Sequence, residues 1–82
     1  MNDSYFSNAK VGDKVTSLTF GHGEIVSIKD PYTTYPIEVR FYSLFSENFT
    51  MDGLWVVDDF SPNLFKGLID LESLKISYNT LK

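Results

Sequence analysis

One short stretch constrains the fold of this chain more than any other part of its sequence. Residues 37–41, IEVRF, alternate strictly between apolar and polar side chains, and Tyr42 continues the pattern. Because successive side chains of a β-strand point to opposite faces of a sheet, this alternation predicts a strand with one face in a core and the other in solvent. The core face carries Ile37, Val39 and Phe41, and the solvent face carries Glu38, Arg40 and Tyr42.

A hairpin is predicted upstream of that strand. Residues 11–15, VGDKV, are typical of a turn that feeds a strand, and Gly12 is free to take a positive φ there. We expect a strand over residues 14–20 to stop at Gly21-His22-Gly23, which we interpret as a breaker because of its backbone freedom. Residues 24–28, EIVSI, are rich in β-branched side chains and are expected to form the second strand.

Turn signals divide the second half of the chain into further short elements. After a proline-bounded loop over residues 30–36, a strand is predicted over residues 47–51, ending at Asp52-Gly53, a dipeptide favoured in tight hairpin turns. Residues 54–57, LWVV, are expected to form another apolar strand, followed by a turn over residues 58–63.

The C-terminal pattern fits two structures. Leu68, Leu71 and Leu74 have helical spacing, whereas Leu74, Ile76 and Tyr78 alternate as in a strand. We expect Leu64 and Phe65 to anchor in the core, then a short turn or helix, then a closing strand. In total, the sequence predicts an all-β fold, a small barrel or roll of five to six antiparallel strands with at most one short helix near the C-terminus.

The length of the chain allows one small core. The chain has 82 residues and no cysteine, so hydrophobic packing rather than disulfides must stabilise it. Residues 1–10 are expected to form a flexible N-terminal arm that Tyr5 and Phe6 attach to the domain. Residues 11–82 are expected to form a single β-barrel domain.

The charge balance disfavours some classes of partner. The formal net charge is −4, with −1 in residues 1–40 and −3 in residues 41–82. Because nucleic-acid binding depends on cations that displace counterions from phosphate, nucleic acid is a less favoured partner. No apolar run approaches the roughly 20 residues that cross a bilayer, and residues 1–10 lack the order of a signal peptide. We therefore expect a cytoplasmic protein without a membrane partner.

Aromatic residues are abundant for so small a core. They make up 16% of the chain. Either large rings fill a thin barrel efficiently, or the surplus forms a contact surface, since aromatic side chains concentrate binding energy at interfaces. The sequence leaves both interpretations open.

The residues that catalysis requires are sparse. His22 is the one histidine, and its position between two glycines is typical of a loop histidine rather than a catalytic base. The nearby acids Asp52, Asp58 and Asp59 do not follow the spacing of a calcium loop. We therefore expect no enzymatic activity, no cofactor and no metal site. The backbone amides around His22 would suit either a plain hairpin turn or an anion-binding nest.

A polar and aromatic group of residues forms the candidate binding site. Loops from different strands of a small barrel can converge on one rim, where rings and a guanidinium would stack a base, clasp a peptide or receive a side chain. The candidate partner-binding residues are His22, Tyr32, Tyr35, Arg40, Tyr42 and Trp55. The alternative is structural: Trp55 is the central ring of the core and Arg40 pairs with a neighbouring acid.

Three segments carry a resemblance to known proteins. Residues 11–15 (VGDKV), 20–26 (FGHGEIV) and 37–41 (IEVRF) resemble the SH3-like, Tudor-like domains at the carboxy termini of bacterial repair helicases. Residues 49–53 and 61–65 are similar to short, free-standing proteins carried by phages and their hosts. The matches cover residues 11–65. The helicase pattern usually has a small or acidic residue at the position of His22, so the partner contacts of that family do not transfer.

The resemblance implies a docking module, and two function hypotheses follow from it. In the first, a phage-type accessory protein inhibits or modulates a host component, such as one of host defence, by direct binding. In the second, an oligomer sequesters a nucleotide-type immune signal, with rings stacked on the base and Arg40 or Lys29 on the phosphate. A third, direct nucleic-acid binding by a Tudor-like or KOW-like module, is disfavoured by the charge.

Overall fold

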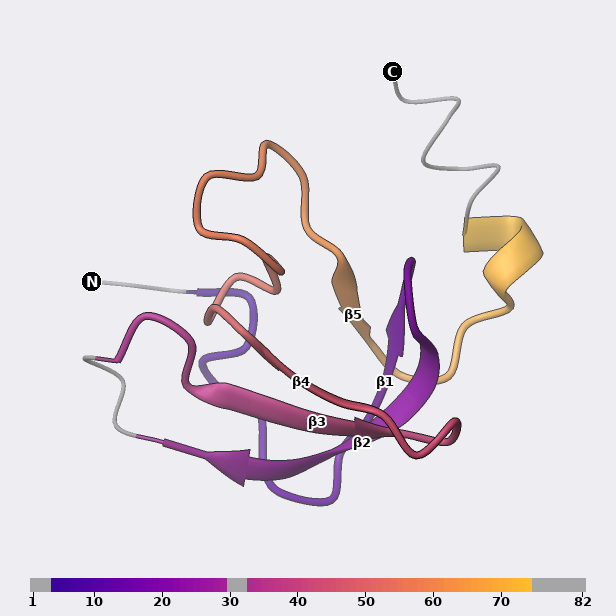
Figure 1. Ribbon diagram of the computed structural model, residues 1–82, viewed down its shortest axis with the longest axis horizontal. Coiled ribbons are helices and arrows are strands. Elements are labelled where there is room, and N and C mark those ends of the chain that lie inside the picture. Colours follow the sequence, from indigo (N-terminus) through magenta and orange to yellow (C-terminus); the bar gives the residue numbers. More distant parts are fainter. Residues whose placement is uncertain (1–3, 30–32, 75–82) are drawn as a thin grey trace.

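The protein folds around one curled antiparallel sheet (Figure 1). The structure, a computed structural model, describes residues 4–29 and 33–74. Its strands are β1 (Lys14–Ser17), β2 (Gly21–Ile28), β3 (Ile37–Phe41), β4 (Ser46–Phe49) and β5 (Leu64–Lys66). Their order is β4-β3-β2-β1-β5, and the sheet curls into a half-barrel, followed by a helical turn over residues 71–74. The prediction of an all-β fold with a short helix near the C-terminus is confirmed.

The core lies on the concave side of the sheet. The alternation predicted for β3 is confirmed, because Ile37, Val39 and Phe41 are buried while Arg40 is exposed. The buried apolar side chains are Phe6, Val15, Ile25, Ile37, Val39, Phe41, Phe49 and Leu64. The segment expected to be an arm thus contributes Phe6, whose backbone N–H donates to the Met51 carbonyl over 2.8 Å. The expectation that Phe6 attaches this segment to the domain is confirmed.

The two glycines of the first hairpin differ in role: Gly21 has a φ of 87°, the backbone freedom predicted for it, whereas Gly23 has another role. The turn between β1 and β2 lies at residues 18–20, and Gly21-His22-Gly23 begins β2 instead of breaking a strand. The reason is packing: a Cβ on Gly23 would lie 2.7 Å from Cδ1 of Phe41 and 2.8 Å from the Arg40 carbonyl oxygen. At position 23, glycine is required because β2 and β3 approach closely, not because the chain turns. The positive φ predicted for Gly12 is confirmed.

The predicted strand over residues 54–57 is wrong. After β4 the chain turns at residues 51–52, as Asp52-Gly53 indicated, but the following residues form no strand. The Val57 N–H donates to the hydroxyl of Tyr35 and the Val56 N–H to the carboxylate of Asp59, over 3.0 and 3.1 Å. These backbone donors are bound by side chains, so an apolar sequence is displayed on a loop. The predicted closing strand after Leu74 lies outside the described residues.

Gly53 joins the two edges of the sheet. Its carbonyl accepts hydrogen bonds from the backbone N–H groups of Asn63 and Leu64, over 2.9 and 3.0 Å. The Lys66 N–H, further along β5, donates to the hydroxyl of Tyr5 over 3.1 Å. Two donors on the outer edge of β5 are thereby bound within the chain, which protects an edge that could otherwise pair with another strand.

Replacing Gly53 by alanine should destabilise the fold strongly. Gly53 has a φ of 83°, and a Cβ there would lie 2.6 Å from the Leu64 carbonyl oxygen and 3.0 Å from the Phe6 ring. We expect Gly53→Ala to lower the free energy of unfolding by about 3 kcal/mol, from backbone strain and overpacking together.

Gly12→Ala is the matched control. Gly12 also has a positive φ, of 98°, but no atom lies within 4 Å of the added carbon. It should lower the free energy of unfolding by only about 1 kcal/mol. Urea denaturation measures both, and equal losses would contradict the role assigned to the Gly53 contact.

Candidate functional site

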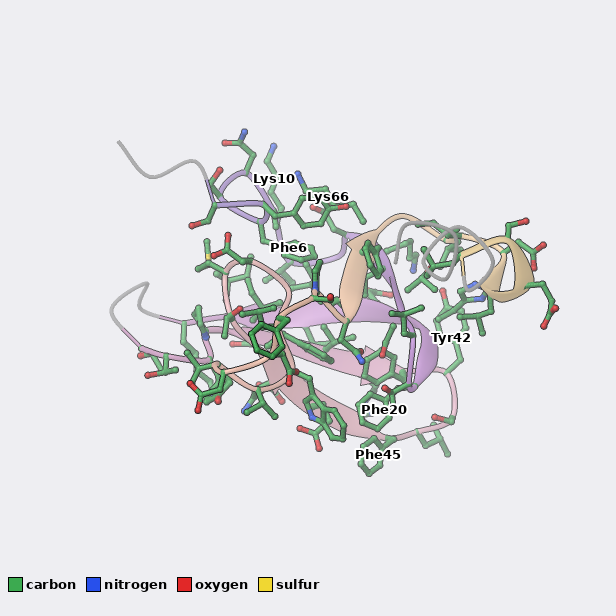
Figure 2. The ribbon with its side chains drawn as sticks, turned by 90° about the horizontal axis from the view of Figure 1, so that it is seen from above. Phe6, Lys10, Phe20, Tyr42, Phe45 and Lys66 are labelled. Carbon is green, nitrogen blue, oxygen red and sulfur yellow. The ribbon has the colours of Figure 1, made fainter. Side chains whose placement is uncertain are left out.

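Four aromatic rings form a cluster that is partly open to solvent. The ring of Phe20 lies at its centre, with centroid distances of 5.3 Å to Phe41, 5.0 Å to Phe45 and 5.0 Å to Trp55. Phe41 is buried, but Phe45 is 46% exposed and Trp55 is 38% exposed. Figure 2 shows Phe20 and Phe45 side by side at one end of the sheet. The cluster is therefore anchored in the core and ends at the surface.

Further exposed apolar side chains belong to the two chain segments that supply Phe45 and Trp55. These segments are residues 42–45 and 55–60, which meet at the Phe20 ring because Phe45 and Trp55 both pack on it. Together with Phe45 and Trp55, the residues Leu44, Val56, Val57 and Phe60 make up what we call the apolar surface. Phe60 is fully exposed, so its ring contributes nothing to the core.

A pocket of about 330 Å³ lies on the outer face of β2 and β3. Its lining residues are Glu24, Val26, Arg40, Phe41, Tyr42 and Leu44. Glu24 and Arg40 are directly opposite each other in the strand pairing. We call it the outer-face pocket; it borders the apolar surface, because Leu44 belongs to both.

Two backbone irregularities lie next to apolar side chains of the outer-face pocket. The pairing of β2 with β3 shifts between Ile25 and Ser27, so Val26 is an extra residue in a β-bulge. Leu44 has a φ of 68° in the turn between β3 and β4, where Phe41 N–H donates to the Phe45 carbonyl over 2.7 Å. Three-residue hairpin loops of this kind usually have glycine at the left-handed position.

The charges around the pocket are not balanced. Lys14 donates a 2.7 Å hydrogen bond to Glu24, which raises the pKa of the lysine ammonium. The contribution of the charged lysine to this pair is present at neutral pH and is lost as the pH rises through that raised pKa. Within residues 4–29 and 33–74, Arg40 has no ion-pair partner, because Glu24 turns toward β1 instead. The pairing of Arg40 with an acid is thus not found among these residues.

His22 is engaged within the chain. It lies in β2 opposite Thr16, and its Nε2 donates a 2.7 Å hydrogen bond to the Ile69 carbonyl. The hydroxyl of Thr16 binds the same segment, donating to the Gly67 carbonyl and accepting from the Ile69 N–H, each over 2.8 Å. These contacts hold residues 67–69 across the outer face of β1 and β2.

The structure separates the residues predicted as one site. Arg40 and Tyr42 line the outer-face pocket, whereas Trp55 packs edge-on against Phe20 and is neither fully buried nor fully exposed. The hydroxyl of Tyr35 binds the Val57 backbone next to the apolar surface. Tyr32 lies outside the described residues.

Sequence reasoning missed several exposed apolar residues. Leu44 and Phe45 follow the predicted strand inside a turn, where polar residues are the norm, and Phe60 stands in a turn between Asp59 and Ser61. Apolar side chains among turn residues are the signal that would have found them. Alternation from buried Ile25 already places Val26 on the outer face, where an apolar side chain is the signal that would have found it.

Comparison of the chain with protein-family models, with curated proteins and with solved structures gives no match. The resemblance to SH3-like and Tudor-like domains therefore stays a prediction. In the described part of the chain, no helix has the length and hydropathy needed to cross a bilayer.

Replacing His22 by alanine should loosen the segment that crosses the outer face. The variant removes the hydrogen bond to Ile69, so we expect the free energy of unfolding to fall by about 1 kcal/mol while the fold persists. Hydrogen exchange should accelerate at the Ile69 amide and not at the Val39 amide in β3. Unchanged exchange at Ile69 would show that the histidine does not hold this segment.

Replacing Leu44 by glycine should not destabilise the protein. Leu44 is 83% exposed and left-handed, so glycine relieves backbone strain and removes little burial. We expect the free energy of unfolding to stay equal or to rise by up to about 1 kcal/mol. Thermal unfolding compares Leu44→Gly with Leu44→Ala, which keeps the strain. A clear loss of stability in the glycine variant would show that the leucine serves the fold.

Proposed function

We propose that this protein is a non-enzymatic binding module that acts by direct contact with a protein partner. The observation that carries the proposal is the apolar surface, whose two segments meet at Phe20 through Phe45 and Trp55. Its exposed side chains come from loops rather than from the strand faces that build the core. Exposed aromatic residues around a partly buried ring are typical of the centre of a protein interface.

The charge near the apolar surface indicates the chemistry of the partner. Asp58 and Asp59 lie within the same loop as Trp55 and Phe60, and the second half of the chain has the larger share of the net negative charge. A partner with an apolar centre and a basic rim would complement this surface. The resemblance to phage-borne proteins makes a component of the host cell the first place to search for it.

The arrangement of the rings favours a protein partner over a nucleotide. A nucleotide sponge needs rings for the base and a cation for the phosphate in one pocket. In the outer-face pocket Arg40 is accompanied by the Tyr42 ring, but the cluster of Phe20, Phe45 and Trp55 contains no basic residue. The largest group of exposed rings is thus better suited to apolar side chains than to a phosphorylated ligand.

Removing one exposed ring should abolish partner binding without affecting the fold. Phe60→Ser changes a fully exposed side chain, so the thermal unfolding temperature should stay the same. With the tagged protein as bait in host extract, we expect a near-stoichiometric partner with the wild type. Its recovery should fall at least ten-fold with Phe60→Ser, since an interface hot spot contributes roughly 2 kcal/mol.

Val11→Ser is the matched control. Val11 is also an exposed apolar residue, but it lies in the turn before β1, outside the apolar surface. It should retain the partner fully. Recovery that is equal with Phe60→Ser and the wild type, or no partner at all, would contradict the proposal.

A further inference from the structure

The outer-face pocket contains features that the fold does not need. Its volume of about 330 Å³ is at the small end of the range for ligand sites, which suits a single side chain. The core lies on the opposite side of the sheet, so neither Val26 nor Leu44 packs in it. The pocket is therefore a separate feature of the outer face.

Two backbone irregularities, the bulge in β2 and the left-handed Leu44, lie at this pocket. The bulge in β2 puts both Val26 and Ser27 opposite Glu38 on the outer face, where a regular strand would have one residue fewer. The left-handed turn holds Leu44 at the pocket wall, although glycine would adopt this conformation without strain. Both irregularities thus lie beside an apolar side chain of the pocket, and residues that keep a strained conformation, as Leu44 does, tend to be found where function requires them.

Arg40 gives the pocket its polar specificity. The cross-strand row on the outer face runs Lys14, Glu24, Arg40, and the one acid of this row is bound to Lys14. The row therefore has a net charge of +1, located at the guanidinium. A guanidinium binds one carboxylate through two parallel hydrogen bonds, and a single cation beside Glu24 matches a monoanion better than a phosphate dianion.

We propose that the outer-face pocket receives an apolar side chain of the protein partner, and that Arg40 pairs with a carboxylate adjacent to that side chain. This inference rests on the proposed function and deepens it. The pocket borders the apolar surface at Leu44, so one partner contacts both. The apolar surface supplies contact area, and the pocket selects an apolar residue next to an acidic group.

Two small probes test this without knowledge of the partner. N-acetyl-leucine carries an apolar side chain next to a carboxylate, and N-acetyl-leucinamide has the same side chain without the charge. Each is titrated into the ¹⁵N-labelled full chain by NMR. We expect saturable shifts at the amides of Val26, Arg40, Tyr42 and Leu44 with N-acetyl-leucine, at a Kd on the order of millimolar. The amide should bind at least five-fold more weakly.

Two variants and a control assign the contributions. Arg40→Gln should make the two probes bind equally weakly, and Leu44→Gly should weaken both while its unfolding temperature stays equal or rises. Lys10→Gln removes a cation from the turn before β1 and should change nothing. Absence of saturable shifts at the pocket, or equal affinity of the two probes for the wild type, would overturn the inference.

The outcome is distinguishable from failure of the proposed function. Phe60 does not line the outer-face pocket, so Phe60→Ser should leave probe binding unchanged while it abolishes partner capture. If a captured partner is lost with Phe60→Ser but retained fully with Arg40→Gln, the pocket inference alone is wrong. If no partner is captured, the proposed function fails, and the probe titrations alone decide whether the pocket receives an apolar side chain next to a carboxylate.

Discussion

The Gly53 carbonyl closes the side of the sheet that strand pairing leaves open. The strand order places β4 and β5 at opposite edges, and within the described residues no ladder joins them. Hydrogen bonds from Asn63 and Leu64 to Gly53 connect the end of one edge to the start of the other, with the Phe6 ring packed beside the glycine. Because the space there admits no Cβ, the contact depends on one residue type. The N-terminal segment, the loop after β4 and β5 all meet at this position.

The same contact determines how the apolar surface is presented. The loop over residues 54–62 is anchored at Gly53 before it and at Asn63 after it, and the side chain of Asn63 also donates to Thr19 in the turn that contains Phe20. The loop is thereby held next to Phe20, with Trp55 packed on that ring. Its remaining apolar residues cannot reach the core, which the strand faces already fill. The loop that displays these exposed apolar residues is thus anchored by hydrogen bonds at both ends.

The outer face of the sheet divides into a covered part and an open part. Residues 67–69 cover the part over β1 and the start of β2, where Thr16 and His22 bind them. The open part contains Arg40, Tyr42 and the pocket next to them. The polar residues that hold the covered part are therefore separate in space from the exposed residues that line the open part.

Local pattern in the sequence determined the sheet. The alternation of residues 37–41, the β-branched run of residues 24–28 and the turn at Asp52-Gly53 predicted β3, β2 and the end of β4, because side-chain periodicity and turn chemistry act over a few residues. Arg40 and Tyr42 were correctly placed on the outer face for the same reason. Only the tertiary structure decided that Gly23 serves a close approach of strands, that His22 binds Ile69, that residues 54–57 form a loop, and that Leu44 and Phe60 are exposed. Each of these depends on which distant segments meet, and a pairing such as that of Gly53 with Leu64 has no signature within either segment alone.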